Sequence, residues 1–345
     1  MRIKTAASTL AAALFVLSYG AVVAAPGEPT EPTPTGPKTE PGTKDNFDPV
    51  YNVWRGTDPR CYHPWNSNRD NKVLLYTRTA GPRHANIQPA LAAGLDPPLG
   101  AGATDNVAQK AIKAWLEAVG VEVHWTEDVN TFAGQLGPGS DYKAVIFLNT
   151  SRDTLWKHGT AINNPPPNPP IANTTTGAHL DAGKTALRQF IRAGGGFVGI
   201  HNAFGTEYNW PWYEGLLGNA NYFDHGANQP GIVQIVAKDS STQGLSNFGF
   251  YDEWYNLEPF PTRVKYLATV DENSLATRRT THPGHGDFHP VAWCQYYDGG
   301  RSWVTTLGHD RAAFTDGSGF PGQQQFKSLI VNGILSAMGN IPFCQ

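Results

Sequence analysis

The chain has 345 residues and a formal net charge of −3, and its lysines and arginines form no basic cluster. It therefore lacks the electrostatic footprint of a nucleic-acid-binding protein. After the amino-terminal segment, no apolar stretch approaches the roughly 18 residues that a membrane-spanning helix needs, so we expect a mature protein without a membrane span.

The amino terminus has the features of a secretory signal peptide. A basic start precedes a short apolar run, Leu10–Val23, and a small-residue cleavage site at Ala24 or Ala25. The alternative is an uncleaved N-terminal anchor. The next twenty or so residues are rich in proline, threonine and glutamate, which predicts an extended, disordered spacer. We expect a signal peptide at 1–25, a spacer at 26–45, one folded domain at 46–345, and a secreted or periplasmic location.

The first half of the folded region alternates between strand and helix patterns. The expected strands are Lys72–Arg78, Val121–Trp125, Tyr142–Leu148 and Phe197–Ile200, and the expected helices are Asp105–Val119 and Asp181–Ala193. Residues 158–178 are rich in proline and threonine and predict an irregular surface insertion. The alternation predicts a doubly wound, mostly parallel sheet.

The second half is richer in strands. We expect strands at Ile232–Ala237, Val264–Val270, Pro290–Tyr297 and Ser302–Leu307, a short helix at Trp210–Leu217 and a closing amphipathic helix at Gln323–Met338. The tight turn at Asp298-Gly299-Gly300 is typical of a hairpin. These strands are therefore expected to extend the parallel core in antiparallel fashion.

Three cysteines leave the disulfide pairing open. Cys61 and Cys344 stand near the two ends of the folded domain, and domain ends often lie close together, so we expect these two to pair. Cys294 lies inside an apolar strand pattern and is expected to be a buried thiol. The odd number of cysteines leaves other pairings open.

Polar side chains follow four of the expected strands. These are His84, Asn149, His201 and His309. If the strands are parallel, all four lie at the carboxyl edge of the sheet, where open α/β folds bind ligands. Taken singly, each histidine is better explained by a structural or surface role, and it is their convergence on one crevice that favours a functional one.

Two further motifs add candidates for acid–base chemistry. His225 follows the short helix, and Asp252 and Glu253 form a carboxylate pair flanked by aromatic residues. A histidine beside a carboxylate is a working general base, because the carboxylate supports the imidazolium. The histidines of residues 282–289 could hold a metal, but their glycine- and proline-rich context favours a solvated loop, with His289 closest to the site.

Two common chemistries are disfavoured by the motifs. No serine stands in a G-x-S-x-G elbow, and Cys294 is in mid-strand, so covalent acyl chemistry is not expected. Gly194, Gly195 and Gly196 precede a strand rather than follow one, which is the wrong order for a dinucleotide-binding loop.

Several pieces of the chain, in this order, resemble the ThuA-like (trehalose utilisation) family. They are GPRH at 81–84, GGGFVGIH at 194–201, WYEGLLG at 212–218, DEWY at 252–255, HPVAW at 289–293, and GR at 300–301 followed by LGH at 307–309. The family is similar to class I glutamine amidotransferases. The resemblance implies a flavodoxin-like, three-layer α/β/α fold with His201 near the place of the amidotransferase cysteine, and hence no glutamine hydrolysis by that route.

The resemblance also implies work on sugars, such as 3-keto-glycosides. A ketone acidifies the neighbouring C–H bond, so a base can abstract that proton, the glycosidic oxygen is expelled, and water then adds. A bound divalent metal would help by polarising the ketone. The signal peptide, spacer and insertion depart from cytoplasmic members and point instead to polymers or cell-wall glycans as substrates.

We therefore expect a secreted carbohydrate-active hydrolase or lyase with a carbohydrate as its partner. Its expected catalytic residues are His84, His201, His225, Asp252, Glu253 and His309, with His201 and His84 as acid and base. Its expected substrate-binding residues are Asn149, Asn202, Trp210, Trp212, Tyr255, Trp293 and Arg301, although an aromatic-rich core explains the tryptophans equally well. The alternatives are a non-catalytic carbohydrate-binding domain and a metal-dependent hydrolase of another class.

Overall fold

The computed structural model describes residues 46–91, 98–156, 181–277 and 282–345. These residues all belong to one compact unit, Thr39–Gln345. The expected signal peptide at 1–25, the spacer at 26–45 and the insertion at 158–178 lie outside the described residues. Within the described part of the chain, every helix is too short or too polar to cross a membrane.

The central sheet is parallel in its first half and antiparallel in its second. The order is β4 (Glu122–Thr126), β3 (Lys72–Tyr76), β5 (Ala144–Leu148), β6 (Gly196–Ile200), β13 (Gly300–Thr305), β12 (His289–Tyr297), β11 (Lys265–Asp271), β8 (Gln229–Ile235) and β9 (Phe248–Asp252). The strands from β4 to β13 pair in parallel. The strands from β13 to β9 pair in antiparallel fashion, with β12 and β13 joined by the expected tight turn.

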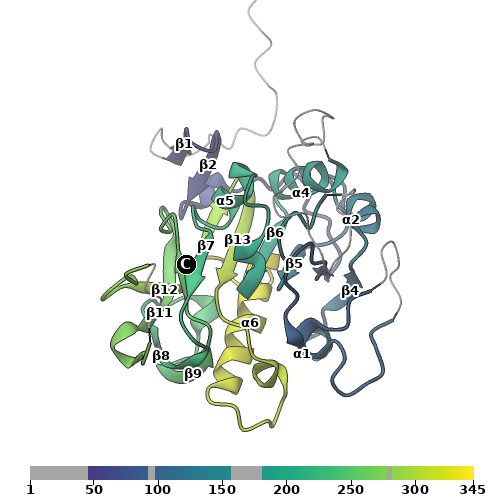
Figure 1. Ribbon diagram of the computed structural model, residues 1–345. Coiled ribbons are helices and arrows are strands. Elements are labelled where there is room, and N and C mark those ends of the chain that lie inside the picture. Colours follow the sequence, from purple (N-terminus) through teal and green to yellow (C-terminus); the bar gives the residue numbers. More distant parts are fainter. Residues whose placement is uncertain (1–45, 92–97, 157–180, 278–281) are drawn as a thin grey trace, which may run out of the picture. The chain divides into compact units, whose positions relative to one another are not determined.

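Helices cover both faces of this sheet. One face packs against α1 (Val107–Glu117) and α6 (Gln323–Met338), and the other packs against α2 (Val129–Gln135), α4 (Ala182–Arg192) and α5 (Pro211–Leu216). In Figure 1, α4 and α5 lie above β6 and β13, and α6 lies below them. Because both faces are covered, β5 and β6 are buried along their whole length. The predicted three-layer α/β/α fold with added antiparallel strands is confirmed.

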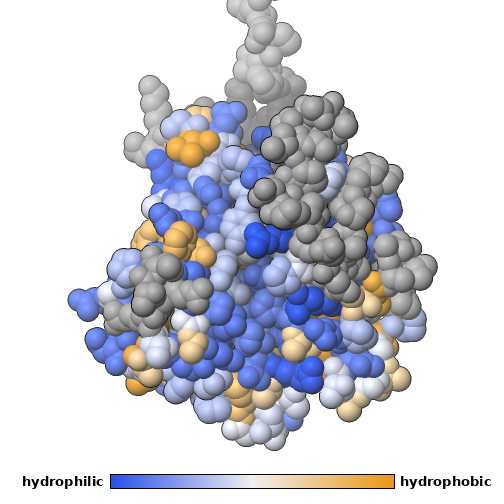
Figure 2. Space-filling view, viewed as in Figure 1, coloured by the Kyte–Doolittle hydropathy of each residue, from blue (hydrophilic) through white to orange (hydrophobic). Residues whose placement is uncertain are grey.

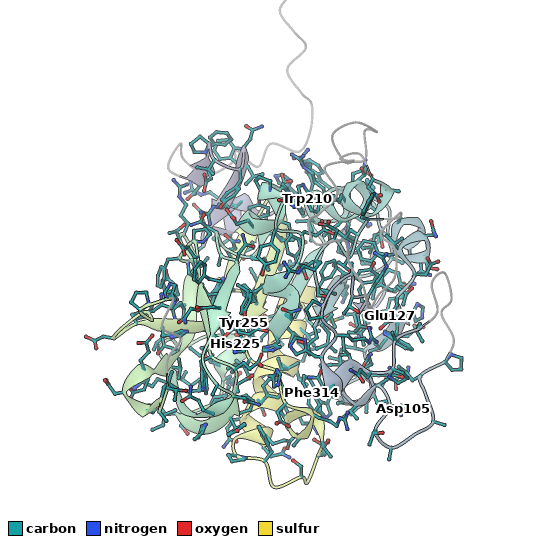
Figure 3. The ribbon with its side chains drawn as sticks, viewed as in Figure 1. Asp105, Glu127, Trp210, His225, Tyr255 and Phe314 are labelled. Carbon is teal, nitrogen blue, oxygen red and sulfur yellow. A yellow bond between two sulfur atoms is a disulfide. The ribbon has the colours of Figure 1, made fainter. Side chains whose placement is uncertain are left out.

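A small separate sheet stands beside the carboxyl edge of the parallel strands. It pairs β7 (Tyr222–His225) with β10 (Tyr255–Leu257), and its register sets His225 opposite Tyr255. Figure 3 shows these two side chains together near the centre of the view. The surface seen from the same side is mainly hydrophilic around this point (Figure 2).

Short elements completed by tertiary contacts were not predicted from the sequence. They include α2, β7, β9, β10 and the amino-terminal pair β1 (Phe47–Asp48) and β2 (Val53–Gly56). Helix α2 is seven residues long and is capped by Asp128, whose carboxylate accepts hydrogen bonds from the backbone amides of Asn130 and Thr131. Such a helix gains most of its stability from packing, here through the fully buried Phe132.

The expected Cys61–Cys344 disulfide is wrong. Cys344 instead bonds to Cys294, with 5.8 Å between their Cα atoms, and Cys61 is a buried free thiol. The carboxyl-terminal tail leaves α6 and returns to the side of β12, which brings the last cysteine to mid-strand. Burial raises the pKa of the Cys61 thiol to about 11, so this group is an unreactive part of the core.

We predict that Cys344→Ala lowers the free energy of unfolding by roughly 4 kcal/mol, the entropy expected for a bridge with a sequence separation of 50. Urea unfolding of oxidised and reduced protein measures this. A reductant should lower the midpoint of the wild type and leave that of Cys344→Ala unchanged. The control Cys61→Ala should keep its response to reductant; equal midpoints for oxidised wild type and Cys344→Ala would contradict the prediction.

Candidate functional site

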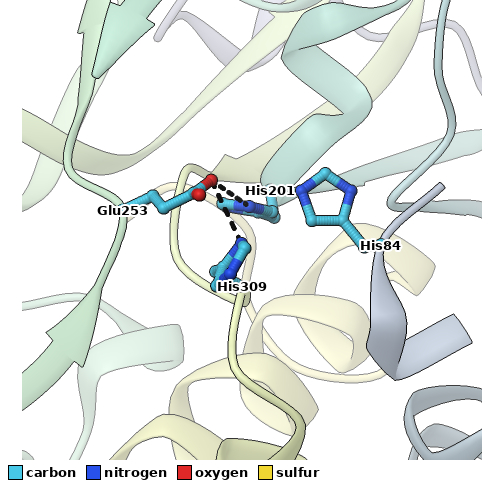
Figure 4. A group of neighbouring side chains, drawn as sticks. All are labelled: His84, His201, Glu253 and His309. Atoms are coloured by element: carbon cyan, nitrogen blue, oxygen red, sulfur yellow. Dashed lines mark ion pairs between the residues drawn. The ribbon is translucent and has the colours of Figure 1, made fainter. Parts of the chain in front are cut away.

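Three histidines and one glutamate converge at the carboxyl edge of the parallel strands. His84, His201 and His309 follow β3, β6 and β13, and Glu253 follows β9 directly. One ligand atom from each of the four side chains lies within 4.8 Å of those from the other three. Figure 4 shows the four side chains pointing toward a common centre. The structure therefore brings together four of the six expected catalytic residues as one group.

His201 is the most firmly held member of this group. Its side chain is fully buried and its Nδ1 donates a hydrogen bond of 2.7 Å to the carbonyl of Thr306. The other ring nitrogen, Nε2, faces the hydroxyl of Tyr255 at a distance of 2.9 Å. The backbone of His201 has φ 51°, an uncommon left-handed conformation that neighbouring structure must hold in place.

Glu253 provides the negative charge that the histidines surround. Its Oε2 lies 3.0 Å from Nδ1 of His309 and 3.7 Å from the Nε2 atoms of both His201 and His225. Burial alone would raise its pKa, but the adjacent rings of His201 and His309 lower the pKa well below its usual value. The carboxylate is therefore ionised throughout the range in which the protein would work.

The other histidines of the group differ in how firmly they hold a proton. Burial acts to lower the pKa of His309, yet the carboxylate of Glu253 outweighs it and raises the pKa above 6.5. Burial, followed by the neighbouring His201 and His309, lowers the pKa of His84 well below that value. Two imidazoles whose pKa values are shifted in opposite directions thus lie with their ring centroids 5.2 Å apart, in an edge-to-face arrangement.

His225 lies at the rim of the group. It stands on β7, and 30% of its side chain is exposed. The side chains of His309 and Glu253 are also partly exposed, at 28% and 15%. A substrate can therefore reach the group from the side on which His225 lies.

Asp252 does not reach this centre, although it was expected to be catalytic. Its buried carboxylate accepts hydrogen bonds from the backbone amides of Gly308, His309 and Glu253, at 2.7, 3.1 and 2.9 Å. Burial raises its pKa, an effect that these amides oppose. Asp252 therefore positions both Glu253 and the loop of His309, and it acts through them.

Asn86 is a positioning residue that the sequence did not reveal. Its amide donates to the carbonyls of Gly308 and His309, at 2.9 and 3.0 Å. Its Oδ1 accepts from Asn149, and the Oδ1 of Asn149 accepts from the backbone amide of Asn202. This chain of amides ties together the loops that carry His84, His201 and His309. Asn149 is fully buried, so it supports the site rather than contacting a substrate.

Two of the expected sugar-stacking tryptophans are core residues. Trp293 is fully buried and its indole donates to the carbonyl of Leu217. Trp212 is 5% exposed and donates to Asp298. Neither has a free ring face, so the stacking role expected for them is wrong. An indole is large enough to dominate a core, and composition alone did not separate the two roles.

The remaining expected substrate-binding residues divide between the site and other places. The hydroxyl of Tyr255 contacts His201 directly. Asn202 follows His201 in the sequence, and its side-chain amide donates to the carbonyl of Thr150. Figure 3 shows Trp210 well apart from Tyr255 and His225. Arg301 stands at the amino-terminal end of β13, opposite the edge that bears His309, and its guanidinium covers the ring of Tyr62. A sugar-anchoring role at this site does not fit either residue.

His289 supports the site by linking Glu272 to the backbone of Tyr255. Its Nδ1 lies 2.8 Å from Glu272, and its Nε2 lies 2.8 Å from the carbonyl of Tyr255. His285, from the same cluster, accepts a hydrogen bond from the backbone amide of Leu257. The solvated loop expected for residues 282–289 is therefore wrong for His289, which is buried. Its position close to the site agrees with the sequence hypothesis.

Comparisons with known proteins place the chain in a family. The family model described as trehalose utilisation (ThuA) matches residues 72–336. The chain is similar to a solved ThuA-like protein from Bacteroides uniformis, with 20% identity, a TM-score of 0.50, and coverage of 78% of this chain and 92% of the other. It is similarly related to a ThuA-like protein from Parabacteroides merdae, with 17% identity, a TM-score of 0.50, and coverage of 78% and 90%. No curated protein matches.

We predict that, in protein freed of metal, His309 titrates above pH 6.5 and His84 stays neutral to well below it. Below the pKa that His309 has in the unfolded chain, the Glu253–His309 contact should make its full contribution to stability. That contribution should be lost as the pH rises through the raised pKa of His309 in the folded protein. The lowered pKa of His84 should cost stability as pH falls below 6.5. Side-chain ¹⁵N NMR measures both titrations.

The variant Glu253→Gln tests whether the carboxylate of Glu253 raises the pKa of His309. It should lower the pKa of His309, because the burial of the ring remains while the carboxylate charge is gone. An unchanged titration of His309 in this variant would contradict the assignment of Glu253 as the group that holds its proton.

Proposed function

We propose that this chain, which belongs to the ThuA (trehalose utilisation) family, is a carbohydrate-active enzyme, a hydrolase or lyase that acts on a glycoside or 3-keto-glycoside. One observation carries the proposal: three imidazoles and an ionised carboxylate meet within 4.8 Å at a partly exposed edge. Groups of this kind, with pKa values pushed in opposite directions, are typical of acid–base catalysis.

The reaction we propose begins at a sugar ketone. A base removes the proton from the carbon next to the ketone, and the electron pair of that C–H bond forms a carbon–carbon double bond as the glycosidic C–O bond breaks. The leaving oxygen takes a proton from an acid in the site. Addition of water to the double bond then completes a net hydrolysis, whereas release before hydration makes the enzyme a lyase.

The electrostatics of the site suit this reaction. Negative charge develops on the ketone oxygen as the proton leaves, so a fixed positive charge nearby lowers the barrier. The three histidines around Glu253 supply positions for such a charge, and His225 at the rim can exchange protons with solvent. The hydroxyl of Tyr255 adds a donor next to His201.

Glutamine hydrolysis is not part of the proposal. His201 stands at the strand end where related amidotransferases are expected to carry a cysteine, and both of its ring nitrogens already have partners. An imidazole held in this way can orient, bind or transfer a proton, but it forms no thioester.

The substrate we propose is an external glycan, because residues 1–25 have the pattern of a signal peptide. A non-catalytic carbohydrate-binding domain is the alternative. Such domains rely on exposed aromatic faces, and Trp212 and Trp293 are buried. The concentration of titratable groups at one edge favours catalysis.

We predict that His201→Ala lowers turnover of the cleaved 3-keto-glycoside by about 10²- to 10⁴-fold, the range typical of acid–base catalysis, because His201 is at the centre of the site that performs it. The assay is a panel of native and 3-oxidised glycans, run with chelator and with added divalent metals. His124→Ala, a partly exposed histidine of β4, is the matched control and should keep wild-type turnover. Unchanged turnover in His201→Ala would refute the site, and a wild type inactive on the whole panel would favour the binding domain.

A further inference from the structure

We infer that His84, His201, His309 and Glu253 bind one divalent transition-metal ion of the Zn²⁺ type, with an open position facing the rim. The binding site stands on the geometry alone. The catalytic use of the ion, as the positive charge that stabilises the sugar enolate, rests on the proposed function.

The distances between the four side chains fit a single ion. Ligand atoms around a tetrahedral zinc, with bonds of about 2.1 Å, lie roughly 3.3–3.5 Å apart. Oε2 of Glu253 is already 3.0 Å from Nδ1 of His309 and 3.7 Å from Nε2 of His201. The widest separation in the group is 4.8 Å. A side-chain movement of about 0.7 Å at each end brings those two atoms to the spacing around a tetrahedral ion.

The donor atoms select the class of metal. Imidazole nitrogens are preferred ligands of zinc, cobalt, nickel and copper, whereas magnesium and calcium prefer oxygen ligands. Three of the four donors here are imidazoles and only one is a carboxylate. The set resembles the three-histidine and mixed histidine–carboxylate sites that hold an ion while leaving a position for water or substrate.

The four side chains are also oriented by hydrogen bonds from neighbouring groups, as metal ligands usually are. Nδ1 of His201 donates to the carbonyl of Thr306, which leaves Nε2 directed at the group. Asp252 holds the backbone amides of both His309 and Glu253, and so fixes two ligands through one carboxylate. These supports hold the ligands in place before an ion arrives, which lowers the cost of binding it.

The packing of His84 against the other two rings also favours an ion. Its ring lies edge-to-face against His201 and His309, at centroid distances of 4.8 and 5.2 Å. One of its ring nitrogens points toward the others in Figure 4. Three imidazoles packed this closely repel each other when protonated, whereas an ion shared between them attracts all three.

An ion at this place changes the role of Tyr255. The hydroxyl of Tyr255 lies 2.9 Å from Nε2 of His201, the nitrogen that the ion would take. Metal binding therefore frees the hydroxyl to donate to a substrate oxygen. Proton transfer then falls to Tyr255 and to His225, which is outside the ligand group.

The test uses cobalt as a spectroscopic probe on the full chain. Protein freed of metal with a chelator is titrated with Co²⁺, and its visible absorption and melting temperature are measured. We expect one Co²⁺ per chain, a visible band typical of four or five ligands, a higher melting temperature, and no displacement by excess Mg²⁺. Failure of the wild type to take up one Co²⁺ would overturn the inference without use of any variant.

Matched variants test the assignment of the ligands. His309→Ala should weaken Co²⁺ binding by about 100-fold, beyond the effect of most supporting residues, and Glu253→Gln should weaken it at least about tenfold. His225→Ala, a histidine 3.7 Å from the same carboxylate, should bind Co²⁺ within about twofold of the wild type. Equal affinity of wild type, His309→Ala and Glu253→Gln would place the ion elsewhere and overturn the inference.

The same measurements separate this inference from the proposed function. Full turnover of a 3-keto-glycoside by chelated, metal-free protein would overturn the metal's catalytic role and leave the proposed function standing. Tight Co²⁺ binding that His309→Ala abolishes, in a protein inactive on every glycan, would support the site and refute the proposed function.

Discussion

Strand β13 runs parallel to β6 on one side and antiparallel to β12 on the other, and the position of the site depends on this pairing. The parallel register sets Thr305 beside Ile200. The two segments that follow β13 and β6 therefore leave the sheet at the same level, and they carry His309 and His201 to the same place. An antiparallel β13 would have sent His309 to the opposite edge, where Arg301 lies. A strand that is last in sequence but central in the sheet thus completes the site.

The group around Glu253 is an electrostatic unit whose members cannot be understood singly. One ionised carboxylate raises the pKa of His309, while burial and the neighbouring rings lower the pKa of His84. The same closeness that makes these groups suitable for proton transfer makes them suitable ligands for a cation, because both uses need lone pairs directed at one point. The carboxylate of Asp252 accepts a hydrogen bond from the backbone amide of His309, and the amide of Asn86 donates one to the carbonyl of His309. These bonds hold the loop of His309 in place at the edge of the sheet.

Much of the site could be predicted from the sequence, because the rule behind it is local. His84, His201 and His309 each follow a recognisable apolar strand, and parallel strands share a carboxyl edge. The residues that could not be predicted depend on distant parts of the chain. Asn86 has no motif of its own, and its importance comes from hydrogen bonds to Gly308 and His309, which are more than 200 residues away in sequence. The tryptophans were misjudged because an indole suits a core and a sugar platform equally well.

Local patterns in the sequence were enough to predict the alternation of strands and helices, the family and the histidines at the strand ends, because apolar periodicity and short motifs are properties of neighbouring residues. The tertiary structure decided which cysteines pair, which aromatics are buried, and that Glu253 rather than Asp252 faces the histidines. Asp252 ends β9 and Glu253 follows it, so the roles of these two neighbouring carboxylates are set by the loop of His309 and the histidines, which come from distant parts of the chain. That placement made Asp252 a support and Glu253 the centre of the site.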